Sequence, residues 1–278
     1  MRFLRNYILL HVDYLVTIYK YVMFKTDKKH FAVLFNIKAI LLGSGARLIY
    51  DKTNFVVTDK KYSWFSYKIS NQRQCDNTYQ SGLLKRVEGL AEVYFLRKIG
   101  FKDGDIFIDC GANVGDLKLW FNLHSININY IGFEPSPVEF RCLQENVKPS
   151  QVHNIGLWKD NGELKFYVSS EGADSSLIKP AAYDEVITAK VSRLDSFLDT
   201  KIKCLKLEAE GAEPEVLEGL GDKLKLVEFV SADLGYERGV EAESTLVPVT
   251  NFLLQNNFEL VDVHHGRICA LFRNKDFL

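Results

Sequence analysis

Short apolar runs alternate with segments of helical period beyond residue 100, and this alternation is the feature that most constrains the fold. The apolar runs lie at residues 106–110, 130–133, 204–207 and 226–232. The segments of helical period lie at 117–123, 137–147, 214–220 and 246–255. Apolar runs without polar alternation are typical of strands buried on both faces of a parallel sheet. The pattern predicts an α/β fold with a doubly wound sheet, which binds ligands at the carboxyl ends of its strands.

The remaining segments predict a domain of residues 81–278 preceded by an extension of residues 1–80. A helical pattern runs from Gly82 to Ile99, and Ser136 with Glu139 forms the pattern of a capping box. Further strands of the domain are expected at 152–156, 163–168, 189–194, 258–263 and 268–272, the last two as an antiparallel pair. Strands of the extension are expected at 47–50, 54–58 and 64–69.

The amino end predicts an amphipathic helix over residues 3–24. Apolar residues recur there at spacings of three and four: Leu4, Ile8, Val12, Leu15, Tyr19 and Val22. Arg5, Asp13 and Lys20 interrupt the segment, which argues against a spanning helix or a secretory signal. The favoured interpretation is packing on the rest of the chain or on a second subunit. The alternative is peripheral contact with an anionic membrane, since basic residues predominate in this segment.

Charge and cysteine content exclude several classes of protein. The 35 Lys and Arg residues nearly balance the 36 Asp and Glu residues, and the net charge of −1 gives no general attraction to nucleic acid. The five cysteines are scattered without a CxxC pair, so neither a disulfide framework nor a zinc site is expected. We therefore expect a reducing, cytoplasmic compartment, with the inner face of the membrane as the place of any peripheral contact.

The loop after the first strand of the domain has the composition of a nucleoside-binding loop. Residues 109–116 read Asp-Cys-Gly-Ala-Asn-Val-Gly-Asp, and small residues let a ligand approach the main chain. Glu134 ends the next strand, where an acid can bind both hydroxyls of a ribose. The predicted cofactor-binding residues are Asp109, Gly111, Asn113, Gly115 and Glu134.

The same loop favours S-adenosylmethionine over a dinucleotide. A dinucleotide fingerprint needs glycine at positions 113 and 116, where this chain has Asn113 and Asp116. A carboxylate in the first helical turn would repel a pyrophosphate, whereas an acid such as Asp109 can stabilise a sulfonium or ammonium group. An NAD-dependent sugar oxidoreductase is kept as an alternative.

Five segments resemble the FkbM family of methyltransferases, in the order in which the family has them. The segments are IFIDCGANVGD (106–116), IGFEPSPVEFRCLQENV (131–147), HNIGLWKDNGELKFYVS (153–169), VSRLDSF (191–197) and LKLEAEGAEPEVLEG (205–219). The resemblance implies a class I methyltransferase fold, S-adenosylmethionine as cofactor, and O-methylation of a small molecule or glycan. Glu208 stands where the family usually has Asp.

Transfer of a methyl group to a hydroxyl calls for a general base, because the hydroxyl loses its proton as it attacks. The candidates are acids that follow the fourth and fifth parallel strands: Glu208, Glu210 and Asp233. A helix cap is the alternative for Glu210 or Glu213. Two acids in one crevice could also bind a divalent cation, but the base is the favoured interpretation and no metal site is predicted.

Polar residues after the fifth strand and near the end of the chain are the candidates for binding the acceptor. They are Tyr236, Arg238 and His264. A surface salt bridge for Arg238 and a solvated turn for His264 are the structural alternatives. The sequence thus predicts an enzyme with a small-molecule or glycan acceptor. A non-catalytic nucleoside-binding or scaffold protein remains a third possibility.

Overall fold

The structure is a computed structural model that describes residues 21–169 and 175–277, and it divides the chain into two compact units. The units are Met1–Leu83 and Leu84–Leu278. Most of the amphipathic helix expected at the amino end falls on residues 1–20, which lie outside the described residues. Within the described ranges, no helix is both long and apolar enough to cross a membrane.

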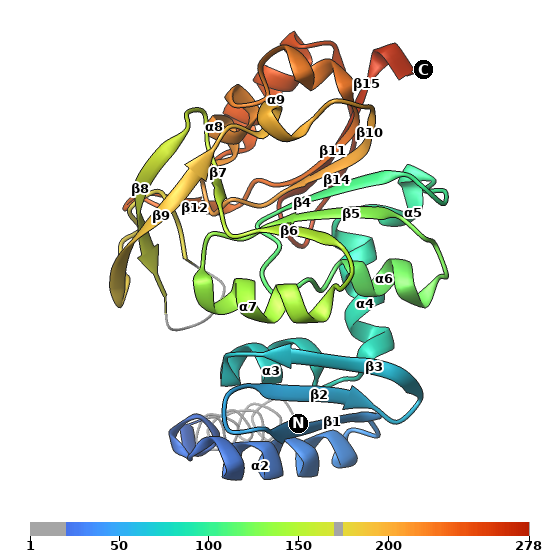
Figure 1. Cartoon of the computed structure of the whole chain (residues 1–278), viewed down its shortest axis with the longest axis vertical. Coiled ribbons are helices and arrows are strands. Elements are labelled where there is room, and N and C mark those ends of the chain that lie inside the picture. Colours follow the sequence, from blue (N-terminus) through green and yellow to red (C-terminus); the bar gives the residue numbers. More distant parts are fainter. Residues whose placement is uncertain (1–20, 170–174, 278) are drawn as a thin grey trace, which may run out of the picture. The chain divides into compact units, whose positions relative to one another are not determined.

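Within its described residues, the first unit is a three-stranded antiparallel sheet with two helices (Figure 1). Its elements are α2 (Lys28–Leu41), β1 (Ala46–Tyr50), β2 (Phe55–Asp59), β3 (Tyr62–Ile69) and α3 (Gln72–Tyr79), with strand order β1-β2-β3. Asp27 caps α2 by accepting the N–H of Lys29 at 3.0 Å. The three strands confirm the expected runs, whereas α3 was not predicted from the sequence.

The second unit contains a seven-stranded sheet of order β14-β15-β11-β10-β4-β5-β6. The strands are β4 (Ile106–Cys110), β5 (Asn129–Phe133), β6 (Gln151–His153), β10 (Ile202–Leu207), β11 (Val227–Asp233), β14 (Phe258–His264) and β15 (Cys269–Asn274). Neighbouring strands from β6 to β11 pair in parallel, while β15 runs antiparallel to both β11 and β14. The doubly wound sheet and its closing antiparallel pair are therefore confirmed.

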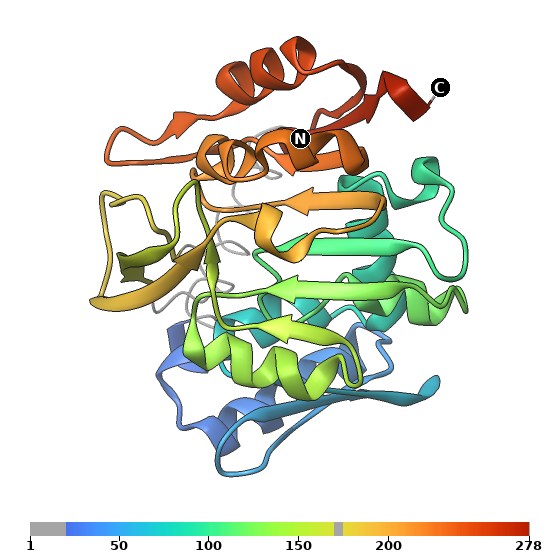
Figure 2. The ribbon, with the colours of Figure 1, turned by 45° about the horizontal axis from the view of Figure 1, so that its top comes forward.

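Helices cover both faces of this sheet. Figures 1 and 2 show α4, α6 and α7 on one face and α8 and α9 on the other. The helices are α4 (Leu83–Val93), α5 (Leu96–Ile99), α6 (Lys118–Leu123), α7 (Pro137–Asn146), α8 (Glu213–Glu218) and α9 (Leu246–Gln255), with 3-10 turns η1 (Leu194–Phe197), η2 (Gly221–Leu226) and η3 (Lys275–Phe277). The central strands are buried because both faces are covered, and Leu205, Leu207 and Val230 have no exposed surface.

Two small sheets flank the large one. The strands β7 (Gly156–Leu157), β8 (Gly162–Val168) and β9 (Glu185–Ser192) pair in the order β7-β9-β8, and β12 (Tyr236–Arg238) pairs with β13 (Glu243–Ser244). The strand expected at 152–156 is divided between β6 and β7, and the one expected at 189–194 begins earlier, at Glu185.

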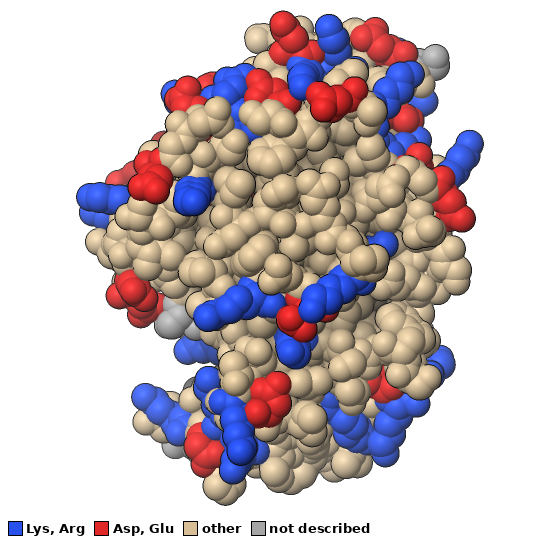
Figure 3. All heavy atoms as spheres, viewed as in Figure 1, with Lys and Arg blue, Asp and Glu red and all other residues tan. Residues whose placement is uncertain are grey.

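Charged side chains of both signs are interspersed on the face drawn in Figure 3, as the balanced composition suggests.

The capping box expected at Ser136 is only partly formed. Ser136 is the N-cap of α7, but its hydroxyl donates to the Glu139 carboxylate and makes no bond to the helix amides. The reason is that the Ser136 N–H itself donates to Glu134, at 2.8 Å. The start of α7 is thus joined to the acid that ends β5.

Candidate active site

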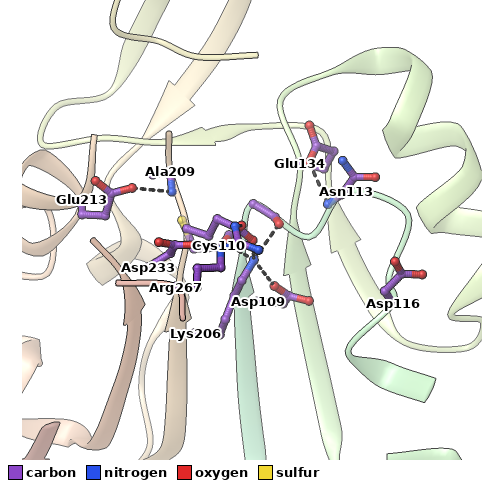
Figure 4. Close-up of polar contacts among 12 residues, drawn as sticks. Asp109, Cys110, Asn113, Asp116, Glu134, Lys206, Ala209, Glu213, Asp233 and Arg267 are labelled. Carbon is purple, nitrogen blue, oxygen red and sulfur yellow. Dashed lines mark hydrogen bonds and ion pairs between the residues drawn. The ribbon is translucent and has the colours of Figure 1, made fainter. Parts of the chain in front are cut away.

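The parallel strands β4, β5, β10 and β11 end at one edge of the sheet, which we call the carboxyl edge. Lys206 of β10 pairs in register with Asp109 of β4 on one side and Ser231 of β11 on the other. Groups at the ends of these strands are therefore neighbours, although Lys206 and Cys110, which are in contact, lie 96 residues apart in the chain. Figure 4 shows Lys206 and Asp109 at the centre of this edge, with Glu134 and Glu213 on opposite sides.

The loop after β4 bends through three residues with positive φ. The φ angles are 71° at Gly111, 48° at Asn113 and 93° at Gly115. A Cβ at Gly111 would lie 2.0 Å from the carbonyl oxygen of Glu208, and one at Gly115 would lie 2.4 Å from a methyl group of Val147. Both glycines are required by this packing and by the backbone conformation. Their predicted contact with a cofactor stays a prediction.

Glu134 is a buried carboxylate whose hydrogen bonds within the described part of the chain come from main-chain amides. Its side chain extends toward the loop after β4, where one oxygen accepts the N–H of Asn113 at 2.8 Å and the other accepts that of Ser136 at 2.8 Å (Figure 4). Burial and the charge of Glu139 raise the pKa of Glu134 to about 8, although the two amides and the charge of Lys206 oppose this shift. Each oxygen keeps room for a second hydrogen bond, so the group can still accept two hydroxyl donors.

Asp109 is enclosed by protein. It is 1% exposed, one oxygen accepts the Tyr130 hydroxyl at 2.7 Å, and the other lies 3.0 Å from Nζ of Lys206. Burial raises the pKa of Asp109, and the nearby ammonium opposes this shift. The sequence assigned this acid to the cationic part of a cofactor, but both of its oxygens are occupied by side chains beneath the loop. Direct contact with a ligand would require one of these partners to leave.

Lys206 joins the two loops of the carboxyl edge. Its side chain is 2% exposed, and Nζ donates to the carbonyl oxygens of Cys110 at 2.9 Å and Gly111 at 2.8 Å. The same atom lies 2.9 Å from a carboxylate oxygen of Glu208. Burial lowers the pKa of Lys206, but the carboxylates of Asp109 and Glu208 outweigh it and hold the group charged. Sequence reasoning gave Lys206 no role, although a lysine inside a buried strand is itself unusual.

Glu208 is held as a carboxylate by two cations. One oxygen lies against Lys206 and the other accepts from the guanidinium of Arg267. Burial would raise the pKa of Glu208, yet the two cations lower it to about 2. Its side chain is one-fifth exposed (20%), so it borders open space. A carboxylate with so low a pKa is a weak base, which argues against the base role predicted for it.

Arg267 closes the site from the turn between β14 and β15. Besides Glu208, its guanidinium pairs with Asp233, which is 1% exposed and also accepts the N–H of Gly235 at 3.2 Å. Burial and the charge of Glu208 raise the pKa of Asp233, and Arg267 opposes them. The sequence could not have shown this arginine, because its partners lie in loops far away along the chain.

Glu210 lies in the turn after β10. Its φ is 50° and that of Gly211 is 94°, and a Cβ at Gly211 would lie 2.5 Å from Cα of Arg238. The carbonyl oxygen of Glu210 accepts the hydroxyl of Ser176 at 2.7 Å. The turn thus joins the segment after β8 to the carboxyl edge, while the base role predicted for the Glu210 side chain stays a prediction.

Glu213 holds that turn in place. Its buried carboxylate accepts the N–H groups of Ala209 at 2.8 Å and Gly211 at 3.2 Å, and the hydroxyl of Thr245 at 3.0 Å. Burial raises its pKa, although these donors oppose the shift. The helix cap offered as an alternative for Glu213 is not formed, because Ala212 is the N-cap of α8 and has no side-chain cap. Glu213 instead binds amides of the turn that precedes the helix.

A family model described as the methyltransferase FkbM domain matches residues 109–277. The chain belongs to the FkbM methyltransferase family. The matched range begins at the last residues of β4 and includes every site residue described above, and the sheet order is that of the class I methyltransferase fold. The family match does not extend to residues 1–108.

The chain is also similar to individual proteins that are named as methyltransferases. "Methyltransferase 1" of Beauveria bassiana is 27% identical over 169 residues, covering 50% of this chain and 68% of that protein. "Hexuronic acid methyltransferase AglP" of Haloferax volcanii is 30% identical over 148 residues, covering 48% of this chain and 57% of that protein. The crystal structure of methyltransferase FkbM from Methylobacillus flagellatus aligns at 17% identity and a TM-score of 0.46, over 63% of this chain and 44% of that one.

The residues predicted to bind the acceptor have different surroundings in this FkbM domain. The guanidinium of Arg238 is paired with both oxygens of Glu215, at 2.9 and 2.7 Å. His264 accepts the N–H of Arg267 at 3.0 Å and so fixes the hairpin turn that carries this arginine. The side chain of Tyr236 is 69% exposed. Their predicted contact with an acceptor stays a prediction.

Asp116 requires a correction to the argument from the sequence. Its carboxylate was expected to repel a pyrophosphate, but Arg86 pairs with it, with Nε 3.1 Å from one carboxylate oxygen. The charge is therefore compensated, and the preference for a cofactor without phosphate rests on Asn113 and the family.

Among residues 21–169 and 175–277, no group of three or more His, Cys, Asp or Glu side chains could hold a metal ion.

Proposed function

We propose that this chain is an S-adenosylmethionine-dependent O-methyltransferase whose acceptor is a hydroxyl of a saccharide or another polyhydroxylated molecule. The observation that supports this cofactor is the buried carboxylate of Glu134 beside the loop after β4. Among the described residues, two main-chain amides are its hydrogen-bond donors. A buried carboxylate with spare acceptor capacity fits the two hydroxyls of a ribose.

Three parts of the carboxyl edge would hold this cofactor. Glu134 would accept the ribose hydroxyls, and the main chain between Gly111 and Gly115 would lie along the nucleoside. Glu208, which is ionised and partly exposed, would place negative charge near the cationic part. When bound, S-adenosylmethionine supplies a methyl carbon already activated by a sulfonium.

The acceptor class is supported by the relative from Haloferax volcanii, whose name states that it acts on hexuronic acid. The alignment covers 57% of that protein, so its substrate is a guide to the chemical class only. A hexuronic acid offers both hydroxyl and carboxylate oxygens. Carboxylates outnumber cations at the carboxyl edge, where Asp109, Glu208 and Asp233 lie with Lys206 and Arg267. This excess of negative charge favours a neutral hydroxyl over a carboxylate as the acceptor group.

Two measurements test the proposal. Calorimetry should show binding of S-adenosylmethionine and not of NAD, and binding of NAD alone would instead support the oxidoreductase. A methyl-labelled donor should then label members of a panel in which each hexuronic acid glycan is paired with its neutral hexose counterpart. Label on a hydroxyl is an ether and survives mild alkali, whereas label on a carboxylate is an ester and is released. Labelling of neutral members that survives alkali supports the hydroxyl acceptor, and alkali-labile label would contradict it.

A further inference from the structure

The acids whose contacts are described at the carboxyl edge are almost all occupied by protein partners. Glu208 and Asp233 are paired with Arg267, and Asp109 is paired with Lys206. Glu213 accepts two main-chain amides and a hydroxyl. Each of these groups is fixed in position, and none has both oxygens available to receive a proton from a ligand.

Glu237 differs from these acids. It lies in β12, directly after the turn that leaves β11, and its side chain is neither fully buried nor exposed. Among the described residues its carboxylate has neither a hydrogen bond nor an ion pair. The group lies beside Asp233: a Cβ placed at Gly235 would be 3.5 Å from an oxygen of Glu237 and 3.4 Å from an oxygen of Asp233. An acid without a partner therefore stands next to the occupied ones.

The charges around Glu237 favour its protonated form. Burial of the side chain is the largest cause that raises its pKa. The carboxylates of Asp233 on β11, Glu208 after β10 and Glu213 on α8 raise the pKa further, while the charge of Arg267 in the β14–β15 turn lowers it. Together they raise the pKa of Glu237 to about 8. A carboxylate of this basicity is well matched to proton abstraction near neutral pH.

We propose that Glu237 is the general base that takes the proton of the acceptor hydroxyl. This inference rests on the proposed function, since only a hydroxyl acceptor needs a base. The acceptor oxygen forms a bond to the methyl carbon as the carbon–sulfur bond breaks, the sulfur keeps the electron pair of that bond, and the hydroxyl proton passes to the Glu237 carboxylate. Asp233 and Glu208 set the basicity of Glu237 and do not exchange protons themselves.

The first test measures the protonation of Glu237 without any acceptor. The full chain is labelled with glutamate carrying 13C at the side-chain carboxyl carbon, and its NMR signals are followed as the pH changes. The signal that is present in the wild-type protein and absent from the Glu237→Gln variant belongs to Glu237. The difference between the two proteins also separates Glu237 from Glu134, whose pKa lies in the same range. We expect the Glu237 signal to titrate near pH 8. A titration between pH 4 and 5 would overturn the proposal, whatever the enzyme methylates.

The second test measures methyl transfer to an acceptor from the panel. Glu237→Gln should lower kcat by about 10²- to 10⁴-fold while the affinity for S-adenosylmethionine stays within twofold. In the wild-type protein kcat should rise tenfold per pH unit below 8 and level off above it, and the variant should lose this slope. The control is Glu241→Gln, since Glu241 is an exposed acid of the same segment; its kcat should be unchanged.

The outcomes separate the two proposals. If the wild-type protein methylates nothing in the panel, the acceptor class is wrong, and the titration still decides whether Glu237 has the basicity required. If the wild-type protein methylates a hydroxyl and Glu237→Gln keeps its kcat within threefold, Glu237 is not the base. If the label is released by mild alkali, the acceptor is a carboxylate that needs no base, and the proposal also fails.

Discussion

At the scale of single residues, Glu134 makes cofactor binding sensitive to pH. Its pKa of about 8 lies above the ordinary value because burial outweighs the amides and the charge of Lys206 that oppose it, so the group is largely protonated at pH 7. Binding of ribose hydroxyls requires the carboxylate. The affinity should therefore rise about tenfold per pH unit up to 8 and be constant above it.

The measurement uses 5′-methylthioadenosine, which has the ribose but lacks the amino acid part that itself titrates. Calorimetry between pH 6 and 9 should show the rise for the wild-type protein. Glu134→Gln should bind more weakly, by at least tenfold, with no dependence on pH. A flat profile for the wild-type protein would show that the ionised form of Glu134 is not the one that binds.

Lys206 offers a second prediction at this scale, concerning stability. Lys206→Met should lower the free energy of unfolding by about 3–5 kcal/mol, because it leaves the buried carboxylate of Asp109 without its cation. Adding Asp109→Asn removes both charges and should recover most of this loss in urea unfolding. Lys148→Met is the control, since Lys148 forms an exposed ion pair with Glu145 in the same unit and its loss should cost at most about 1 kcal/mol. A double variant no more stable than Lys206→Met would refute the pairing argument.

At the scale of helices and strands, the sequence predicted the elements whose pattern is local. The runs at 106–110 and 204–207 are recognisable because a strand covered on both faces must be apolar throughout. The helix α3 was missed because its buried side chains include Gln74 and Asp76, so no apolar period marks it. The early start of β9 was missed because Val186, near that start, is exposed.

The sequence likewise predicted where the acids of the site lie, but not which side chains they contact. The sequence pointed to the acids that follow each parallel strand, because strand ends of one sheet meet at one edge. It could not show which acids are neutralised, since that depends on partners such as Lys206 and Arg267 brought together by the fold. Glu208 was therefore a candidate base from the sequence, whereas in the structure its pKa is low. Glu237 has no hydrogen-bond or ion-pair partner among residues 21–169 and 175–277, and its pKa is raised.

At the scale of the whole molecule, the amino-terminal segment remains a sequence-based prediction. We propose that its basic, amphipathic helix serves assembly or attachment to an anionic membrane, because its apolar stripe lies far in sequence from every residue of the carboxyl edge. Deleting residues 1–20 keeps Asp27, the cap of α2, and so should leave the first unit folded.

The truncated protein should keep the affinity of the full chain for S-adenosylmethionine within twofold. It should also lose binding to anionic vesicles or change its sedimentation coefficient beyond the loss in mass. Vesicles of zwitterionic lipid are the control, since binding by the basic helix depends on negative surface charge and should fall as salt is added. If truncation leaves vesicle binding and oligomeric state unchanged, the segment serves neither attachment nor assembly. If truncation weakens only the binding of S-adenosylmethionine, the segment contributes to the cofactor site instead.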